Sequence, residues 1–304
     1  MLNALHNTIE DVGLGKALEE LLDILQIEAK GEDCFVGRSQ DLGWKAVYGG
    51  QFLAQGLRAC QHTVDDSRYV HSIHAYFLKR AWASAPIVYH VECLRDGHSF
   101  SARRLLAYQH DTLVFSMQVG FQMPEKGLFH QESVSVVGEP EDFMHEQELA
   151  QKYPERYPPE YRAYLQRERA FDVRSVVDFN AFEPTVLPPK RGFWCRVNGT
   201  VPNDPHLSAC LALWMSDSSI LGTSLFPHGL SWLSPGLQIT SLDHVFWFHK
   251  PIDVNEWFYY DLDSPISSGG RGFGRGRVIQ KGMLVGSVMQ EGLIRLTDSA
   301  ISLD

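Results

Sequence analysis

Hydrophobic residues recur along the chain at two different periods, which predict helices and strands. In residues 15–27 they return every third or fourth position, as on one face of an amphipathic helix. Residues 51–64 are apolar around most of a helical circumference, which is typical of a buried helix. Four runs rich in β-branched and aromatic residues follow, with an Asp-Gly turn signal at Asp96: residues 70–78, 87–94, 101–108 and 113–122. A sheet wrapped around one central helix would bury such a helix on nearly all sides.

The same order of elements returns in the second half of the chain. A second apolar helix is predicted at residues 207–221, preceded by extended pieces at 171–182 and 192–201. Four further strand-like runs follow it: residues 237–250, 256–262, 272–280 and 284–293. Ser72-Ile73 matches Ser241-Leu242 at an offset of 241 − 72 = 169 residues, and Leu113-Val114 matches Leu284-Val285 at 284 − 113 = 171. We interpret the chain as a tandem duplication.

Residues 239–250 form the densest β-rich stretch, with aromatic and polar side chains in twelve positions. We expect one central strand here, because Val, Ile, Phe, Trp and Thr suit a pleated, half-buried surface. Ser241 and Asp243 then share a face, since side chains alternate with period two. A buried face that carries a hydroxyl and a carboxylate needs hydrogen-bond partners. A structural network or an active site could supply them.

Composition and charge exclude several classes of protein. The chain has 304 residues, of which 44% are hydrophobic, and a net charge of −10. It therefore offers no general basic surface to nucleic acid or anionic lipid, and any anionic ligand must be met by local positive groups. The five cysteines are scattered without a Cys-x-x-Cys pair, which argues against a disulfide framework and a zinc site.

Targeting signals are also missing from the sequence. Residues 1–6 lack the basic start and apolar core of a signal peptide, and no run of about 18 apolar residues predicts a membrane span. Residues 300–304 do not form a Ser-Lys-Leu peroxisomal address. We therefore expect a cytoplasmic protein.

Asp217 is the most informative acidic residue. Counted along a helix, it falls in an otherwise apolar stripe that comprises Leu213, Trp214, Ile220 and Leu221. A buried carboxylate is rare, but the neighbouring serines could equally mark a solvated helix end. The corresponding helix of the first half has no carboxylate before Asp65. The two copies have therefore diverged in polar content, as expected if only one performs chemistry.

Gln290 is the second candidate. Strand alternation places it on the same inward face as Leu284, Gly286 and Val288. Its amide can donate and accept hydrogen bonds, which is what positioning a water molecule requires. A glutamine at a sheet edge that bonds to the backbone is the alternative interpretation.

The histidines and serines carry weaker signals. His71 and His74 lie three residues apart in a strand and face opposite ways, as do His244 and His249 at five residues apart. Neither pair can chelate a metal from one strand, and we expect most histidines to be structural. The sequence contains no Gly-x-Ser-x-Gly nucleophile elbow.

The glycine-rich stretch at residues 267–277 has two interpretations. It does not match Gly-x-Gly-x-x-Gly and no helix follows it, so a dinucleotide loop is not supported. A strongly bent strand is favoured. Arg271, Arg275 or Arg277 could still bind a phosphate, because guanidinium groups fit phosphate oxygens well.

Taken together, these motifs resemble the type II acyl-CoA thioesterase family over essentially the whole chain. The segments that carry the resemblance are residues 47–51 with Gln55, 70–78, 94–104, 241–244 with 247–249, 271–272 and 290–292. The resemblance implies an α+β double hot-dog fold, in which two tandem antiparallel β-sheets are each wrapped around a long central α-helix. It also implies the hydrolysis of fatty acyl-CoA to free acid and CoA.

The resemblance further implies an organisation and a site. We expect an N-terminal hot-dog domain at residues 1–135, a charged helical linker at 136–170 and a C-terminal hot-dog domain at 171–304. The catalytic trio of the family falls on Asp217, Ser241 and Gln290, where Ser replaces the more usual Thr. No cofactor or metal is expected. The partners are an acyl-CoA substrate and further copies of the chain, as a dimer or tetramer.

Two other functions remain open from the residues. A hydratase or dehydratase that acts on acyl thioesters would change an enoyl double bond and release no thiol. A non-catalytic acyl-CoA binding module would bind the thioester without cleaving it.

Overall fold

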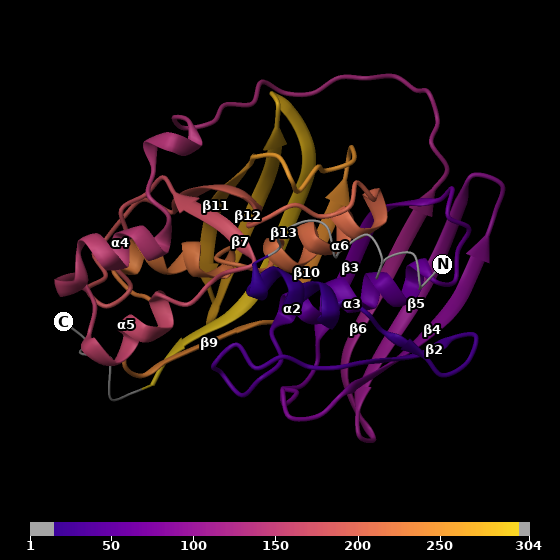
Figure 1. Cartoon of the computed structure of the whole chain (residues 1–304), viewed down its shortest axis with the longest axis horizontal. Coiled ribbons are helices and arrows are strands. Elements are labelled where there is room, and N and C mark those ends of the chain that lie inside the picture. The colour runs from indigo at the N-terminus through magenta and orange to yellow at the C-terminus, as the bar shows by residue number, and fades with distance from the viewer. Residues whose placement is uncertain (1–14, 298–304) are drawn as a thin grey trace.

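Residues 15–297 of the chain are described by a computed structural model (Figure 1). The expectations for residues 1–6 and 300–304 lie outside the described residues.

The first half contains two helices and a meander of strands. Helix α2 (Lys16–Ile24) covers the outside, and helix α3 (Gly49–Gln61) is buried along nearly its whole length. The strands are β1 (Glu28–Ala29), β2 (Cys34–Gly37), β3 (Tyr69–Phe77), β4 (Ile87–Asp96), β5 (Phe100–Gln109) and β6 (Thr112–Gln122). The predicted amphipathic helix, buried helix and four strands are all present. Only β4, β5 and β6 follow one another as a meander, because β3 pairs with β6 and not with β4.

Short helices connect the halves, and the second half repeats the first. The connection holds η1 (Pro140–Asp142), α4 (Glu146–Lys152), η2 (Pro154–Arg156) and α5 (Pro159–Leu165). The second half comprises β7 (Phe171–Ser175), β8 (Lys190–Val197), α6 (Pro205–Ser216), η3 (Leu221–His228), β9 (Leu237–Ser241), β10 (Asp243–Phe248), β11 (Phe258–Ser268), β12 (Arg271–Gln280) and β13 (Met283–Leu296). The strand predicted at residues 171–182 ends at Ser175, and the chain beyond it turns; in one such turn the Asn180 side chain accepts from Phe182 N–H.

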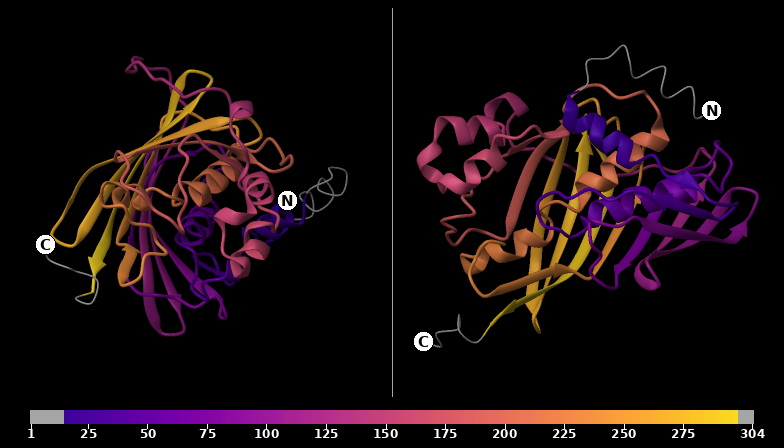
Figure 2. Two further views of the ribbon diagram at one scale, coloured as in Figure 1. Left: turned by 90° about the vertical axis from the view of Figure 1, so that its left-hand side faces the viewer. Right: turned by 60° about the horizontal axis from the view of Figure 1, so that its bottom comes forward.

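The strands form one continuous antiparallel sheet with a mirrored order. It runs β1-β2-β4-β5-β6-β3-β10-β13-β12-β11-β8-β7, so that β3 and β10 join the two halves edge to edge. Ile73 pairs with Phe246 at this junction. Figure 2 shows the strands of both halves as one curved layer with α3 and α6 on its inner side. The double hot-dog expectation is confirmed, and the joining of its two sheets at β3 and β10 is an addition to it.

Helices α3 and α6 form the centre of the core, packed against each other. Ten residues of α6 are buried, from Leu207 to Ser216. Together with η3 this stretch, Pro205–His228, is long and apolar enough to span a membrane by length and composition, but 78% of its most apolar window is buried inside the protein. In the described residues it therefore serves as the core helix.

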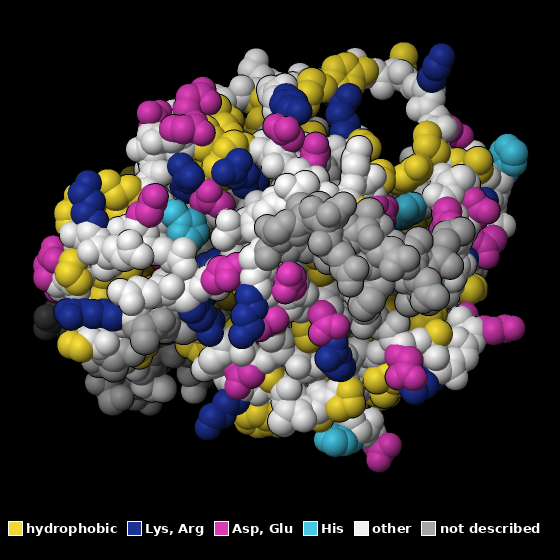
Figure 3. Space-filling view, in the orientation of Figure 1, with side chains coloured by type: hydrophobic (Ala, Val, Ile, Leu, Met, Phe, Trp, Pro, Cys, Tyr) yellow, Lys and Arg dark blue, Asp and Glu magenta, His cyan; other side chains and the backbone are white. Residues whose placement is uncertain are grey.

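On the face seen in Figure 3, acidic and basic side chains are interspersed.

The run at residues 239–250 is two strands and not one. Both β9 and β10 pair with β13, but Ser241 pairs with Gly292 while Val245 pairs with Met289, so the register shifts by one residue between them. Such a bulge re-aims the side chains on either side of it. Strand β3 has a register shift at the equivalent place, between Val70 and Ser72. The bulge is thus shared by both halves.

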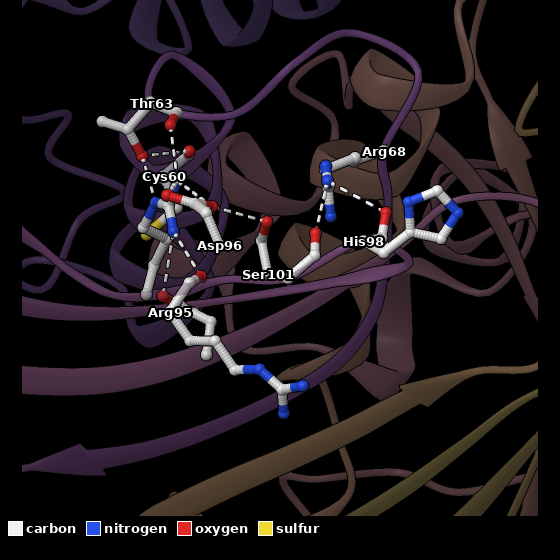
Figure 4. A network of polar contacts seen from close by, with 10 residues as sticks. Cys60, Thr63, Arg68, Arg95, Asp96, His98 and Ser101 are labelled. Carbon is white, nitrogen blue, oxygen red and sulfur yellow. Dashed lines mark hydrogen bonds and ion pairs between the residues drawn. The ribbon is translucent and has the colours of Figure 1, made fainter.

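A buried arginine ties the sheet of the first half to the end of helix α3. Arg103 is only 2% exposed, and its guanidinium donates to both the hydroxyl and the carbonyl of Thr63. It also donates to Asp96 and to the carbonyls of Arg95 and Ala102. Figure 4 shows Thr63, Arg95, Asp96 and Ser101 gathered in this network. We call Arg103, Thr63 and Asp96 the Arg103 cluster.

The Arg103 cluster predicts a stability difference between neighbouring arginines. Lys in place of Arg103 cannot reach all of these acceptors, and Arg103→Lys should lower the free energy of unfolding by about 3 kcal/mol. Arg104 is 47% exposed and pairs with Glu92 on the surface, so Arg104→Lys should cost less than about 0.5 kcal/mol. Urea unfolding of both variants measures the difference. Equal losses would show that the cluster does not stabilise the fold.

Candidate active site

Asp217 lies at the C-terminal end of α6, next to the N-terminus of α3. It is the C-cap residue of α6 and not an interior helical residue as predicted, because the helix ends at Ser216 and Ser219 adopts a left-handed conformation with φ +66°. Its side chain is nevertheless buried, with 6% exposed. The solvated helix end considered from the sequence is therefore wrong, and the buried carboxylate is confirmed.

Gln290 on β13 contacts Asp217 directly. Its Nε2 donates to Asp217 Oδ1 at 2.6 Å and lies 3.1 Å from His244 Nδ1. Gln290 is fully buried and faces inward, as predicted. Its Oε1 is the one buried side-chain oxygen without a hydrogen-bond partner in the described part of the chain. An unpaired buried acceptor is costly, so this oxygen marks a place for a donor from outside the chain.

A chain of hydrogen bonds fixes how the Gln290 amide is turned. Ser216 Oγ donates to the carbonyl of Leu213 at 2.9 Å, and it therefore accepts from His244 Nε2, also at 2.9 Å. His244 then carries its proton on Nε2, so Nδ1 is an acceptor for Gln290 Nε2. The second amide proton goes to Asp217. Both amide protons are used in these hydrogen bonds, and Oε1 remains as an acceptor without a donor in the described part of the chain.

The structure does not join Ser241 to this contact. Ser241 ends β9 and pairs with Gly292, two residues beyond Gln290 on β13. It is half-buried, and its hydroxyl makes no hydrogen bond with any residue between 15 and 297. Its neighbour Asp243 accepts from Glu291 N–H at 2.6 Å and so holds β10 against β13. Asp217 and Gln290 are brought together, while Ser241 lies on the adjacent strand β9 and, within residues 15–297, forms no hydrogen bond with either of them.

Burial sets the protonation of both ionisable groups at the site. It raises the pKa of Asp217 from 3.8 to about 6, against the lowering effect of hydrogen bonds from the Gln290 side chain and the Gly50 backbone. It lowers the pKa of His244 from 6.5 to about 3. At neutral pH His244 is therefore an uncharged ring that links Ser216 and Gln290 by hydrogen bonds. Asp217 is ionised and is a stronger base than an ordinary aspartate.

Both halves of the chain enclose Asp217. A Cβ on Gly49, the first residue of α3, would lie 2.4 Å from Asp217 Oδ2, so glycine is needed for this close approach. Tyr48 Oη donates to the carbonyl of Trp214 at 3.0 Å, and Tyr260 Oη donates to the carbonyl of Ser216 at 2.7 Å. The two tyrosines thus satisfy the last carbonyls of α6 and hold the helix end that carries Asp217.

The first half has no equivalent of this site. Gln290 pairs with Gly274 between β13 and β12, and the corresponding pair between β6 and β5 is Val119 with Arg103. An apolar side chain thus replaces the amide. Arg103 occupies the space at the end of α3, whereas a Cβ on Gly274 would already lie 2.8 Å from the Ile220 carbonyl. Only the second half retains the polar pair.

The other sequence candidates lie outside this site. The glycine-rich stretch is a hairpin and not a single bent strand: it comprises the end of β11, a turn at Gly269 and Gly270, and the start of β12. Its arginines pair with carboxylates. These pairs are Arg271 with Glu291, Arg275 with Asp263, and Arg277 with Asp261 and Glu132. The five cysteines all lie within the described residues and carry free thiols.

Sequence reasoning did not identify His244 and Ser216 as parts of the site. Both are buried polar residues next to a predicted candidate: His244 follows Asp243, and Ser216 precedes Asp217. No local motif indicates that a strand histidine and a helix serine meet across 28 positions. Their side chains form a hydrogen bond only because α6 packs against the inner side of β10.

An antiparallel sheet wrapped around two central helices is a double hot-dog fold, and in this chain a buried carboxylate and amide meet at the end of α6. Structures with this fold include the acyl-CoA thioesterase II TesB2 of Mycobacterium marinum, which is 33% identical, with a TM-score of 0.74, 91% of this chain covered and 98% of that one. A conserved hot-dog protein from Alicyclobacillus acidocaldarius is 18% identical, with a TM-score of 0.72, 90% of this chain covered and 97% of that one. At this identity the similarity supports the fold alone.

Sequence comparison gives the family. The acyl-CoA thioesterase profile matches residues 162–293, and the profile of the acyl-CoA thioesterase N-terminal domain matches residues 39–122. Acyl-CoA thioesterase 2 of Haemophilus influenzae is 38% identical, with 92% of this chain and 99% of that protein covered. Human acyl-coenzyme A thioesterase 8 is 33% identical, with coverages of 90% and 88%. The chain belongs to the acyl-CoA thioesterase family.

The raised pKa of Asp217 predicts a pH dependence. If the carboxylate takes up a proton during turnover, kcat/KM should fall about tenfold per pH unit below pH ~6, because the protonated form is inactive. The same shift means that the contribution of Asp217 to stability decreases as pH rises from about 4 to about 6, since the folded state holds the proton more tightly.

A pH–rate profile of the native chain beside Asp217→Asn tests this dependence. The acidic limb with an apparent pKa of about 6 should be absent from the residual activity of the variant. A limb that persists unchanged in Asp217→Asn would assign the titration to another group.

The hydrogen-bond chain predicts a role for Ser216. Without its hydroxyl, His244 can place its proton on Nδ1, which turns a donor toward Gln290 Nε2 and disturbs the amide. Ser216→Ala should therefore lower kcat by about tenfold, the scale of about 1.4 kcal/mol in a barrier. Ser218, two residues on, is half-buried, and within residues 15–297 its hydroxyl forms a hydrogen bond only with Ser219 Oγ, so Ser218→Ala is the matched control.

Nitrogen NMR of the His244 ring gives a readout that a purely structural role would not change. The native chain should show the Nε2–H tautomer, and Ser216→Ala a mixture. The same single tautomer in both, with an unchanged kcat, would rule out the relay.

Proposed function

We propose that this chain hydrolyses fatty acyl-CoA to free acid and CoA by direct attack of a water molecule held by Asp217, Gln290 and Ser241. Family membership gives the class of reaction. The residue roles rest on the geometry of the buried pair and on the resemblance of the surrounding motifs.

The observation that carries the proposal is the unpaired Oε1 of Gln290. The hydrogen-bond chain through Leu213, Ser216 and His244 accepts one amide proton of Gln290, and Asp217 accepts the other. The amide oxygen is thereby left as an acceptor beside the Asp217 carboxylate. A water molecule bound there would donate one proton to Gln290 and one toward Asp217. Its lone pair would then point away from both groups, toward the substrate.

The reaction proceeds in two steps. The water oxygen bonds to the thioester carbonyl carbon while Asp217 takes its proton, which gives a tetrahedral oxyanion. The oxyanion collapses, the carbon–sulfur bond breaks, and the proton on Asp217 passes to the departing CoA sulfur. A thioester is an activated acyl group, so no covalent intermediate is required. Asp217 ends in its starting form.

The N-terminus of α3 would stabilise the oxyanion. Gly49 and Gly50 begin this helix, and the Gly50 backbone N–H donates to the Asp217 carboxylate, so the positive end of the helix dipole faces the reacting atoms. We accordingly propose that both hot-dog domains contribute: residues 171–304 supply the water-binding side chains, and residues 1–135 supply the helix N-terminus. Residues 136–170 connect them.

Ser241 would complete the water site. Its hydroxyl forms no hydrogen bond with any of residues 15–297, and Ser241 lies on β9, next to β13. Ser in place of Thr keeps the hydroxyl and loses one methyl group, so the hydrogen bond is retained while the χ1 rotamer is less restricted.

Two further proposals concern the setting of the enzyme. A homo-oligomer, dimer or tetramer, is proposed from the family resemblance, and analytical ultracentrifugation tests it. A cytoplasmic location is proposed from the sequence, and cell fractionation tests it.

Substitution of Gln290 tests the water-binding role. Gln290→Ala should lower kcat by roughly 10²-fold, the scale of losing an oriented catalytic contact. The assay measures free thiol released from saturated acyl-CoAs of graded chain length. The neighbouring Met289 is exposed on the opposite face of β13, so Met289→Ala is the control.

The same assay separates the alternatives. A hydratase would alter enoyl-CoA without releasing thiol, and a binding module would retain acyl-CoA intact. Near-normal thiol release by a correctly folded Gln290→Ala variant would contradict the residue assignment while leaving the reaction class in place.

Ser241 allows a paired test. Ser241→Thr keeps the hydroxyl and should retain at least the native kcat, whereas Ser241→Ala should lose about tenfold or more. If the alanine variant is as active as the threonine variant, the hydroxyl has no part in holding the water.

A further inference from the structure

A short two-stranded ribbon extends from the active-site elements of the first half. Ala46 and Trp82 form an antiparallel bridge, Val47 N–H donates to the Ala81 carbonyl at 3.0 Å, and Ala83 N–H donates to the Lys45 carbonyl at 2.9 Å. One side of the ribbon leads directly into Tyr48 and the start of α3. The other side follows the end of β3.

The ribbon exposes aromatic and cationic side chains together. Trp44 is 51% exposed and Trp82 is 50% exposed. The Arg80 guanidinium lies 4.6 Å from the centre of the Trp82 ring and donates to the Trp44 carbonyl at 3.2 Å. Lys45 holds a left-handed backbone conformation, with φ +58°. Non-glycine residues in this region are uncommon and cluster at functional sites.

In the described part of the chain, the basic side chains of the ribbon are not paired with carboxylates, unlike the arginines of the glycine-rich stretch. Within residues 15–297, neither Lys45 nor Arg80 forms an ion pair, and neither does Lys79 next to them. The one carboxylate bonded to the ribbon is Asp41, which accepts from the backbone N–H groups of Gly43 and Lys45. In a chain with a net charge of −10, the ribbon is a local positive site beside the reaction centre.

Chain geometry limits how far the ribbon lies from Asp217. Lys45 is five residues from Gly50, which hydrogen-bonds Asp217, so the Cα atoms of Lys45 and Gly50 are at most ~18 Å apart. Arg80 is three residues from Phe77, so their Cα atoms are at most ~11 Å apart. The Phe77 ring would lie 3.0 Å from a Cβ on Gly49. The pantetheine arm of CoA holds its phosphates and adenine well away from the thioester. The ribbon is thus placed for the nucleotide end of the substrate.

We propose that residues 44–47 and 79–83 bind the 3′-phosphorylated adenine nucleotide of the substrate. Arg80 and Lys45 pair with phosphate oxygens, and the exposed indole rings of Trp82 and Trp44 give the adenine a stacking surface. The inference rests on the proposed hydrolysis of acyl-CoA, and it adds where the CoA part is held.

Comparison of two substrates tests this proposal. Acyl-pantetheine has the same thioester as acyl-CoA but no nucleotide. Arg80→Glu should raise KM for acyl-CoA and lower the ratio of kcat/KM between acyl-CoA and acyl-pantetheine by about tenfold. Lys126→Glu makes the same charge change on an exposed residue beyond the opposite end of β6 and should leave the ratio unchanged.

Inhibition by adenosine 3′,5′-bisphosphate gives a second readout that does not depend on turnover of acyl-CoA. With acyl-pantetheine as substrate, the nucleotide should inhibit the native chain and inhibit Arg80→Glu about tenfold less. Equal losses on both substrates, or equal inhibition of both proteins, would overturn the nucleotide site. Failure of the native chain to release thiol from either substrate would instead contradict the proposed function.

Discussion

The hydrogen bond between Asp217 and Gln290 is the interaction on which the rest of the site depends. A carboxylate at the end of one core helix and an amide on a buried strand are stable inside a protein only if their donors and acceptors are matched. The Gln290 amide gives one proton to Asp217 and the other to His244, and Gly50 contributes a backbone donor from the first half. Removal of any one of these partners would leave a buried polar group unpaired. The site is therefore part of the interior that holds α3, α6 and β13 together.

The duplication explains why there is one such site and not two. Both halves share the buried helix, the meander and the bulge near the start of the strand at the junction. They differ at the positions that carry the chemistry: Val119 in the first half takes the place of Gln290, and Arg103 takes the place of Gly274. In the first half, Arg103 occupies the space at the end of α3, and its hydrogen bonds there stabilise the fold. The glycine of the second half leaves room for the end of α6 and η3 to approach the sheet.

Much of this arrangement could be predicted from the sequence, for physical reasons that differ between residues. The apolar circumference of α3 and the β-rich runs give the fold, and the rarity of a carboxylate beside Leu213 and Trp214 indicates Asp217. The bulge between Ser241 and Val245 could not be foreseen, because it depends on register against a distant strand. Likewise the relay through Ser216 and His244 depends on how α6 packs on the sheet. The spacing of hydrophobic residues and the secondary-structure propensities of the side chains predict helices and strands. Strand register and helix packing decide which polar atoms meet.

The central claim is that a water molecule attacks the thioester directly, with Asp217 as base and not as nucleophile. A single turnover in ¹⁸O-labelled water, with enzyme in excess over acyl-CoA, detects the covalent route in which water hydrolyses an acyl anhydride at the Asp217 carbonyl carbon. Direct attack places the label in the released fatty acid and leaves Asp217 unlabelled by mass spectrometry of its peptide. Label in the Asp217 carboxylate, with an unlabelled fatty acid, would show an acyl-enzyme anhydride and would contradict the account.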